Sequence, residues 1–557
     1  MIIQNGVRKE LIHKRFCLGA HPILQHFMNH LKIPEIMSTY LPNDQRMNLS
    51  TDKTLMVVLH NILTNPMSLY EMGQWIQPLD ETHVGLAAGE SSLINDDRVA
   101  KSLDDFYNSR HQDIFFRLAL RAIKIFKIDC QQIHQDTTTI TFSGRYDNWR
   151  AQPALAYGHN KDHRPDLKQL VLGLSVSADG SVPLTHQIYD GNQTDDRLHP
   201  DNHRRLRQLL EKSDFIYTAD SKLGTDDNLT KIVSCGGLFV TVMPRTWKED
   251  AQFRQEARQN KIQWKHLLSK ANNRKPDSKR DHYYLAQGTY TTEQGYRLLW
   301  IKSSEKARQD KQTRERHIQK ALEELKAVQS KLNTYSLKKH KNIKNRITSV
   351  LQEQQCVNFI DYHITKKYYT KDSYLKPGRP QASAPKKSVS KKYFTVSFSL
   401  NRPRLAQERL TDGVFPLLTN LKDHSPKKIL EIYKYQPFLE KRHSQLKTYQ
   451  EIAPVFLKKS ERVIAYLHMQ VMALMVATLI ERQLRLAMKR HAIDSLPIYP
   501  EDKGCPYPTT FDIVRLFNNV ERYEVQENDR AFIFPAQLNK IQKQVLELLE
   551  VPIALYQ

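Results

Sequence analysis

The 557-residue sequence predicts an α/β protein of several domains, in which a long insertion interrupts a mixed sheet and a helical domain comes before it. Three observations lead to this prediction. The length exceeds what a single hydrophobic core usually serves. Residues 1–125 show the apolar spacing of helices, and short β-rich runs separated by turns begin near residue 128.

The first 125 residues are expected to form an all-helical N-terminal domain. Thr51 and Asp52, residue types that cap helix N-termini, precede one apolar run. An earlier run has apolar residues at intervals of three and four, namely Ile23, Leu24, Phe27, Met28 and Leu31. The spacing predicts helices and leaves their role open.

Residues 126–245 are predicted to form the first part of a mixed sheet. A hairpin-type turn at 178–181 separates two of its strands. The expected elements are strands at 133–142, 170–177 and 182–189, a helix at 200–212, a strand at 215–219, a helix at 226–234 and a strand at 238–243. The order βββαβαβ is that of an RNase H-like sheet, in which three antiparallel strands precede βα units.

Residues 246–392 are predicted to be an insertion that combines strands, a helical arm and a basic loop. The arm, at 304–355, is highly charged, and a reversal at 333–336 would fold it into a helical hairpin. Its apolar residues have near-heptad spacing, at Ile318, Leu322, Leu325 and Leu332. Residues 376–392 are expected to be a flexible basic loop. The second part of the sheet is expected at 393–490 and a helical tail at 491–557.

The chain carries a large positive surplus, with 84 Lys and Arg against 60 Asp and Glu and a net charge of +24. Such a surplus produces a positive field over much of the surface, so nucleic acid is the first expected partner. A basic but inert surface is the alternative. For the N-terminal helices, contact with DNA and a purely structural role as a brace are both open. Arg379, Lys386 and Lys387 would contact DNA or belong to an ordinary charged loop.

The sequence favours a cytoplasmic protein without membrane association. Its five cysteines are scattered, which argues against a zinc ribbon or a complete disulfide framework. The first residues are followed by Arg8, Lys9 and Glu10 and do not resemble a secretory signal. The apolar stretch 463–480 contains polar residues such as His468, so a buried helix is expected rather than a membrane span.

Two aspartates stand where a strand can present a carboxylate to a metal ion. Phosphodiester chemistry with two metal ions needs carboxylates that converge from separate segments. Asp136 lies among β-branched residues typical of a buried strand, where a carboxylate is costly without a cation. Asp220 ends an apolar strand, where open α/β sheets place ligands. Alternatively, Asp136 is structurally hydrogen-bonded and Asp220 caps a helix, although Thr225 or Asp226 are simpler caps.

Glu440 is the candidate for a third carboxylate because of its spacing on a predicted helix. A helix starts or restarts at Gln436-Pro437, and Lys447 follows Glu440 by seven residues, about two turns. Both side chains therefore face the same way, and the lysine can hold a DNA backbone beside the carboxylate. The alternative is a pair of charges on a solvated helix face, which Glu440 and Lys447 taken alone favour.

Three regions resemble the signature regions of DDE insertion-sequence transposases. They are His134-Gln135-Asp136-Thr137-Thr138, Tyr217-Thr218-Ala219-Asp220-Ser221, and Asp412-Gly413-Val414-Phe415-Pro416-Leu417-Leu418-Thr419-Asn420 followed by Tyr433, Glu440 and Lys447. They are most similar to the group with a long insertion before the Glu and a Tyr-x2-Arg-x3-Glu-x6-Lys motif. The resemblance covers roughly 128–245 and 393–490, including matches at 158–167 and 191–195.

The resemblance implies an RNase H-like catalytic core in which Asp136, Asp220 and Glu440 hold two Mg²⁺ or Mn²⁺ ions. It implies cleavage of transposon ends and joining of the freed 3′-hydroxyls to target DNA. It also implies a bacterial, nucleoid-associated protein that acts on DNA, as a homodimer. A nuclease of the same fold without strand joining, and a catalytically silent transposase-derived DNA-binding protein, are the alternatives.

The resemblance also suggests which residues contact DNA beside the cut. Tyr433 and Lys447 would position the flanking DNA. The family arginine falls at Gln436, which can donate a hydrogen bond to a phosphate but carries no charge. Arg442 or Lys441 are the candidates to supply that charge.

Overall fold

The computed structural model describes residues 2–557 except 5–6, 10, 43–46, 145, 163, 272–279, 375–385, 454–456, 500, 502 and 528–529. The chain forms two compact units. Unit 1 combines Met1–Thr241 with Ile429–Gln557, and unit 2 is Val242–Lys428. The helical N-terminal region is therefore not a separate domain, because it shares a unit with the first part of the sheet and with the C-terminal helices.

The mixed sheet of unit 1 has the strand order β6-β5-β4-β7-β8. Strand β4 pairs antiparallel with β5 and parallel with β7, while β5–β6 is antiparallel and β7–β8 is parallel. The elements, which follow the predicted order βββαβαβ, are β4 (Gln132–Phe142), β5 (Lys168–Ser177), β6 (Pro183–Tyr189), α7 (His199–Leu210), β7 (Ile216–Thr218), α8 (Asp226–Ser234) and β8 (Leu238–Val242).

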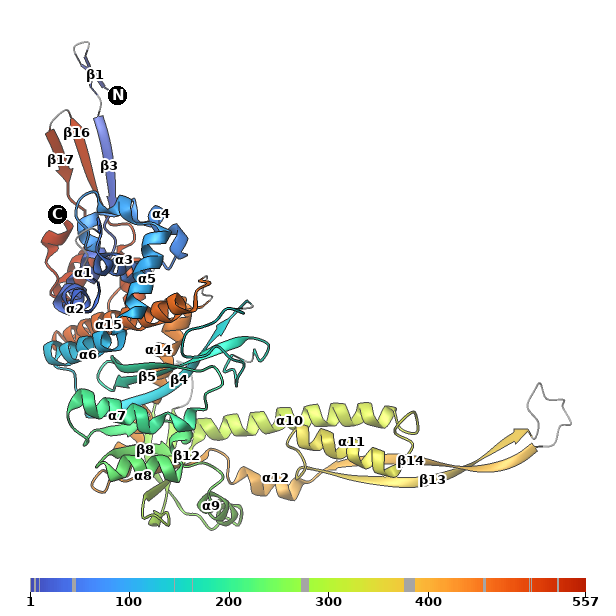
Figure 1. The fold of residues 1–557 in the computed structure, drawn as a ribbon. Helices are drawn as coiled ribbons and strands as arrows, with labels where there is room; N and C mark the ends of the chain where they lie inside the picture. Colours follow the sequence, from blue (N-terminus) through green and yellow to red (C-terminus); the bar gives the residue numbers. More distant parts are fainter. Residues whose placement is uncertain are drawn as a thin grey trace. The chain divides into compact units, whose positions relative to one another are not determined.

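Helices from both ends of the chain belong to unit 1, and some of them contact the strands of this sheet (Figure 1). The apolar residues that predicted the first helix are buried: Ile23, Leu24, Phe27, Met28 and Leu31. The main helices are α1 (His21–His30), α2 (Ile33–Tyr40), α3 (Thr51–Thr64), α4 (Met72–Ile76), α5 (Asp96–Asn108), α6 (His111–Phe126), α14 (Gln436–Thr448), α15 (Ser460–Arg490), α16 (Thr510–Phe517) and α17 (Lys540–Leu548).

Helix α15 is the core helix of unit 1. It packs against α3, α5, α14 and β6. By length and composition it is apolar enough to cross a membrane, but its apolar window is entirely buried inside the protein. This agrees with the buried helix predicted for residues 463–480, and the side chains of His468, Gln470 and Thr478 are buried with it.

The two ends of the chain depart from the all-helical prediction. Strands β1 (Ile2–Gln4) and β2 (Val7–Lys9) form a hairpin, and a second small sheet has the order β3-β16-β17. Its strands are β3 (Leu11–Cys17), β16 (Glu521–Glu527) and β17 (Arg530–Phe534). The helical prediction is wrong for these strands. For β3 and β16 the reason is that they pair across some 500 residues, and such pairing leaves no local signal.

Unit 2 begins with a sheet of order β15-β12-β10-β9, with β11 paired to β12. Phe253 stacks on Trp300 with ring centroids 3.9 Å apart and attaches the first helix to the sheet. The elements are α9 (Lys248–Arg258), β9 (Trp264–Lys270), β10 (Asp281–Ala286), β11 (Tyr290–Thr291), β12 (Arg297–Ser303), α12 (Arg402–Arg409) and β15 (Val414–Thr419).

The rest of unit 2 is an arm made of a helical hairpin and a two-stranded ribbon (Figure 1). Helices α10 (Ser304–Ser330) and α11 (His340–Glu353) form the expected hairpin, which packs on the near half of β13 (Ile360–Tyr374) and β14 (Lys386–Leu400). Asn333 in the reversal bonds to the backbone of Phe394. The predicted basic loop is wrong over residues 386–392, because they form the start of β14.

Candidate functional site

The register of two parallel strands brings Asp136 and Asp220 together. The last pair of the β4–β7 ladder joins His134 to Thr218, and each aspartate follows its strand's member of that pair by two residues. The backbone at Asp220 is still extended, with φ −69° and ψ −174°. Residues two apart in extended chain point to the same face. Both carboxylates therefore emerge side by side, past the end of β7.

Burial and neighbouring negative charges act on both carboxylates, and for Asp136 the neighbouring charge is that of Asp195. The side chain of Asp136 is 21% exposed, and burial raises its pKa while Lys161 lowers it. Burial also raises the pKa of Asp220, and the charges of Asp136 and Asp195 raise it further. A carboxylate whose pKa rises for these two reasons stands in a place that favours an added positive charge.

Asp220 also acts as a cap, which is its alternative role, although it caps a different helix from Thr225. Its Oδ1 accepts a hydrogen bond of 2.9 Å from the backbone N–H of Lys222 and begins the short 3₁₀ helix Ser221–Leu223. Thr225 caps the following helix α8, as predicted. Capping uses one carboxylate oxygen, so the other Asp220 oxygen is available for a second contact.

Glu440 is exposed on α14, and its charge acts on Tyr433, as do the charges of the two aspartates. Burial raises the pKa of the Tyr433 hydroxyl to about 12, with further contributions from the charges of Asp220, Glu440 and Asp136. The three acids predicted from the sequence are thus all within electrostatic reach of one tyrosine. Glu440 itself is exposed to solvent, as its alternative interpretation states.

Gln436 attaches α14 to strand β4 next to Asp136. Its side-chain Oε1 accepts a hydrogen bond of 2.9 Å from His134 Nδ1, and its Nε2 donates one of 2.9 Å to the carbonyl of Gln135. Burial lowers the pKa of His134 to about 4, so the imidazole is neutral at physiological pH. The proposed phosphate contact by Gln436 is not supported, because both ends of its amide are used inside the protein.

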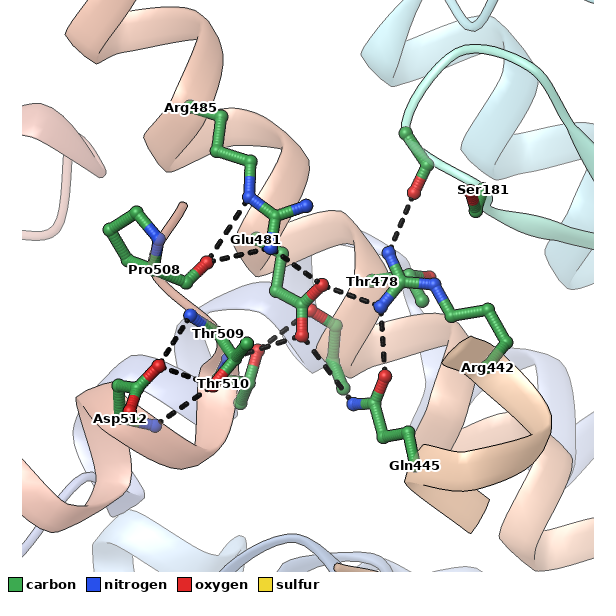
Figure 2. A network of polar contacts seen from close by, with 12 residues as sticks. Ser181, Arg442, Gln445, Thr478, Glu481, Arg485, Pro508, Thr509, Thr510 and Asp512 are labelled. Atoms are coloured by element: carbon green, nitrogen blue, oxygen red, sulfur yellow. Dashed lines mark hydrogen bonds and ion pairs between the residues drawn. The ribbon is translucent and has the colours of Figure 1, made fainter. Parts of the chain in front are cut away.

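Arg442 is also buried, and its place in the fold differs from the DNA contact predicted for it. Its guanidinium pairs with Glu481 at 2.6 Å and donates to Gln445 and to the carbonyl of Gly180. The two side chains of the ion pair are 8% and 0% exposed. Figure 2 shows Glu481 between Arg442 and Arg485. Arg442 therefore holds α14 against α15 and is not available to a DNA phosphate.

The remaining predicted DNA contacts lie in different places. Lys447, half-buried on α14, pairs with Asp162 at 2.8 Å. Lys387 is exposed on β14, and Lys386 begins that strand, with its side chain outside the described residues. Arg379 lies outside the described residues altogether.

Three neighbours of the acids were not identified as site residues from the sequence. Lys161 Nζ lies 3.5 Å from Asp136 Oδ1 and 3.8 Å from Asp195 Oδ2. His443 Nδ1 lies 3.7 Å from Asp136 Oδ2, and burial together with the charges of Lys161 and Lys447 lowers its pKa to about 3. The contact of His443 is therefore not an ion pair at neutral pH. Lys161 and Asp195 both fall in segments that match the transposase group, which was the available signal.

The donor chemistry of this site suits a hard divalent cation. Mg²⁺ and Mn²⁺ prefer carboxylate oxygens, and the two aspartates are crowded and raised in pKa. Lys161 already supplies a positive charge beside one of them. Among the described residues, no three His, Cys, Asp or Glu side chains are close enough together to hold a metal ion as they stand. Glu440 would have to approach the aspartates to complete such a set.

Comparisons with known proteins cover part of the chain. A family model described as "Domain of unknown function (DUF4277)" matches residues 17–120, which hold helices α1 to α5 and most of α6. No curated protein matches the chain. The cryo-EM structure of the piggyBac transposase synaptic complex with hairpin DNA is similar over 80% of each chain, at 9% sequence identity and a TM-score of 0.29. A TM-score this low does not establish a common fold, so the site rests on its own geometry.

Proposed function

We propose that this protein is a DNA transposase that cleaves transposon ends and joins the freed 3′-hydroxyls to target DNA. The observation that carries the proposal is the register of β4 and β7, which places Asp136 and Asp220 each two residues beyond the last pair of the ladder. The helix α14, which bears Glu440, packs against β4. The strand order and the βββαβαβ sequence of elements are those expected of an RNase H-like core. The motif resemblance supports transposition rather than simple DNA hydrolysis.

Asp136, Asp220 and Glu440 would hold two Mg²⁺ or Mn²⁺ ions. Bound ions would neutralise the scissile phosphate and activate the attacking oxygen. In the first step, a water oxygen bonds to phosphorus at the transposon end and a 3′-hydroxyl is released. In the second, that 3′-hydroxyl oxygen bonds to a target phosphorus and displaces the target's 3′ oxygen. Tyr433 lies among the acids and would orient the DNA there.

The ribbon of unit 2 is the surface that we propose for duplex DNA. Over 366–372 and 387–393 it carries six exposed lysines against one aspartate. Lys367 lies opposite Tyr393 and Lys391 opposite Tyr369, so lysines and tyrosines share one face. A two-stranded ribbon has the width of a DNA major groove. Lysine contacts to phosphates give affinity that depends on salt and little on sequence.

The test is a strand-cleavage and strand-transfer assay on DNA that carries the terminal repeats of the element. Wild-type protein with Mg²⁺ is expected to cut the end and to join pre-cut ends to a target. Asp136→Ala should abolish both reactions while DNA binding stays roughly unchanged. Cutting without joining would favour a nuclease, and binding without cutting by the wild type would favour a catalytically silent protein.

Two further properties belong to this proposal. Joining two transposon ends requires that both be held together, so we expect a homodimer on DNA. The site of action would be the bacterial cytoplasm, at the nucleoid. Sedimentation of the protein with and without end DNA would report the oligomeric state directly.

A further inference from the structure

Lys161 reaches into the acid cluster from a loop that precedes β5. Its ammonium donates to the carbonyl of Thr137 at 2.6 Å and to Thr137 Oγ1 at 3.0 Å. It also lies within ion-pair distance of Asp136 and Asp195. Thr137 Oγ1 in turn donates to Asp195 Oδ1 at 2.8 Å. One ammonium thus joins strand β4 to the acid that follows strand β6.

The loop that carries Lys161 is held firmly in place. Gly158 packs so closely on Gly191 that a Cβ would lie 2.2 Å from the Gly191 carbonyl oxygen. Gln169 Nε2 donates to that same carbonyl at 2.8 Å. The backbone N–H of Lys161 donates to Thr139 Oγ1, and Asp162 pairs with Lys447 on α14. These contacts of the loop therefore fix the position of the Lys161 ammonium.

Among the described residues, Lys161 is the lysine that lies within ion-pair distance of Asp136. The other basic group beside this carboxylate is the imidazole of His443, whose Nδ1 lies 3.7 Å from Asp136 Oδ2. Lys447 forms its ion pair with Asp162. The charge of Lys161 lowers the pKa of Asp136 and of Asp220, whereas Asp195 raises both. Lys161 thus offsets the repulsion of three carboxylates.

We propose that Lys161 is the internal counter-ion of the acid cluster and that Asp195 is its fourth carboxylate. The ammonium stabilises the protein before a divalent cation binds and competes with that cation for the same carboxylates. This inference rests on the proposed function, because it assumes that the acids bind a divalent cation. It adds two residues to the site and assigns them opposite effects on cation binding.

The experiment measures Mg²⁺ binding by the full-length protein through thermal unfolding, without DNA. Lys161→Met should unfold at a lower temperature than the wild type when Mg²⁺ is absent. It should then be stabilised at roughly tenfold lower Mg²⁺ concentrations, because a competing positive charge is gone. Asp195→Asn should shift the Mg²⁺ response the other way, to higher concentrations. Lys161→Arg, which keeps the charge, should bind Mg²⁺ with the same weak affinity as the wild type.

Lys101→Met is the matched control, since Lys101 is exposed on α5 and pairs with Asp105 rather than with the acid cluster. It should leave the Mg²⁺ response unchanged. Equal or weaker Mg²⁺ binding by Lys161→Met would overturn the proposal. If Lys161→Met does not fold, an unshifted response in Asp195→Asn would overturn it instead. If Asp220→Asn shows the same Mg²⁺ response as the wild type, the acids do not bind the cation and the proposed function is contradicted as well. Failure of the Lys161 proposal alone would leave the Mg²⁺ response dependent on Asp220, so the two failures are distinguishable.

Discussion

The acid cluster of unit 1 and the basic ribbon of unit 2 present charge in opposite ways. Asp136 and Asp220 are forced together by backbone register, and burial raises the pKa of both. The ribbon lysines lie on exposed strands with little protein around them. The first arrangement destabilises the folded chain, while the second hardly affects its stability. Under the proposed function, the acids would serve chemistry and the lysines would serve DNA binding.

The largest expected effect is a loss of stability when the contact that holds the Glu440 helix α14 against α15 is removed. Arg442→Met leaves Glu481 without its main partner inside the protein, and removing one member of a buried ion pair costs about 3–5 kcal/mol. Urea unfolding followed by circular dichroism should show this loss of stability. Arg490→Met, which breaks an exposed pair with Glu550, should cost less than about 1 kcal/mol. Equal stability of the two variants would contradict this account of α14.

The ribbon should respond in binding rather than in stability. Replacing Lys367, Lys387 and Lys391 by Ala removes three charges from one ribbon face. The affinity for duplex DNA should fall roughly 10- to 100-fold at low salt, and the salt dependence should weaken by about one unit of slope per lysine. Fluorescence anisotropy across a salt series measures both quantities, and the unfolding temperature should stay within about 1 °C.

The control for the ribbon uses the same charge change elsewhere in unit 2. Lys311, Lys320 and Lys326 are exposed on α10, outside the ribbon. Their replacement by Ala should change the salt slope by clearly less than the ribbon variant does. An equal change would mean that DNA responds to the net charge of the arm and not to the ribbon face.

The smallest effect should be a gain in stability when an acid is removed. Asp220 has a pKa above its ordinary value of 3.8, so its ionised form destabilises the folded protein at pH values above the folded pKa. Asp220→Asn should therefore raise the unfolding temperature by roughly 1–3 °C at pH 7.5. The gain should shrink as the pH falls toward 3.8, where both proteins carry a neutral side chain. A destabilised variant at pH 7.5 would show that the cap on Lys222 outweighs the repulsion.

Local patterns predicted the parts of this molecule that depend on local sequence. The β-branched run around Asp136 and the apolar run before Asp220 indicated the two strands. Their register comes from pairing between strands that are distant in sequence, and it could be read only from the structure. The near-heptad spacing of 318–332 predicted the helical hairpin. Glu440 could be chosen only through the motif resemblance, since its surroundings are those of an ordinary exposed charge.

The errors concern partners that are distant in sequence. Gln436 bonds to His134, some 300 residues away, and Arg442 bonds to Glu481 on another helix. The sequence of α14, which carries Gln436 and Arg442, gives no sign of either partner. Both side chains were therefore predicted to be exposed, although they are buried. The basic segment 386–392 looked like a loop because lysines and serines dominate it. Its strand forms through pairing with residues 368–374.

The most direct test of the central claim is DNA cleavage by Glu440→Gln, compared with Glu431→Gln. Both glutamates are exposed on neighbouring helices, and neither change should affect folding. If Glu440 completes the site of Asp136 and Asp220, Glu440→Gln should lose at least 100-fold in cleavage rate with Mg²⁺, while Glu431→Gln stays within about twofold. Equal cleavage by the two variants would contradict the three-acid site.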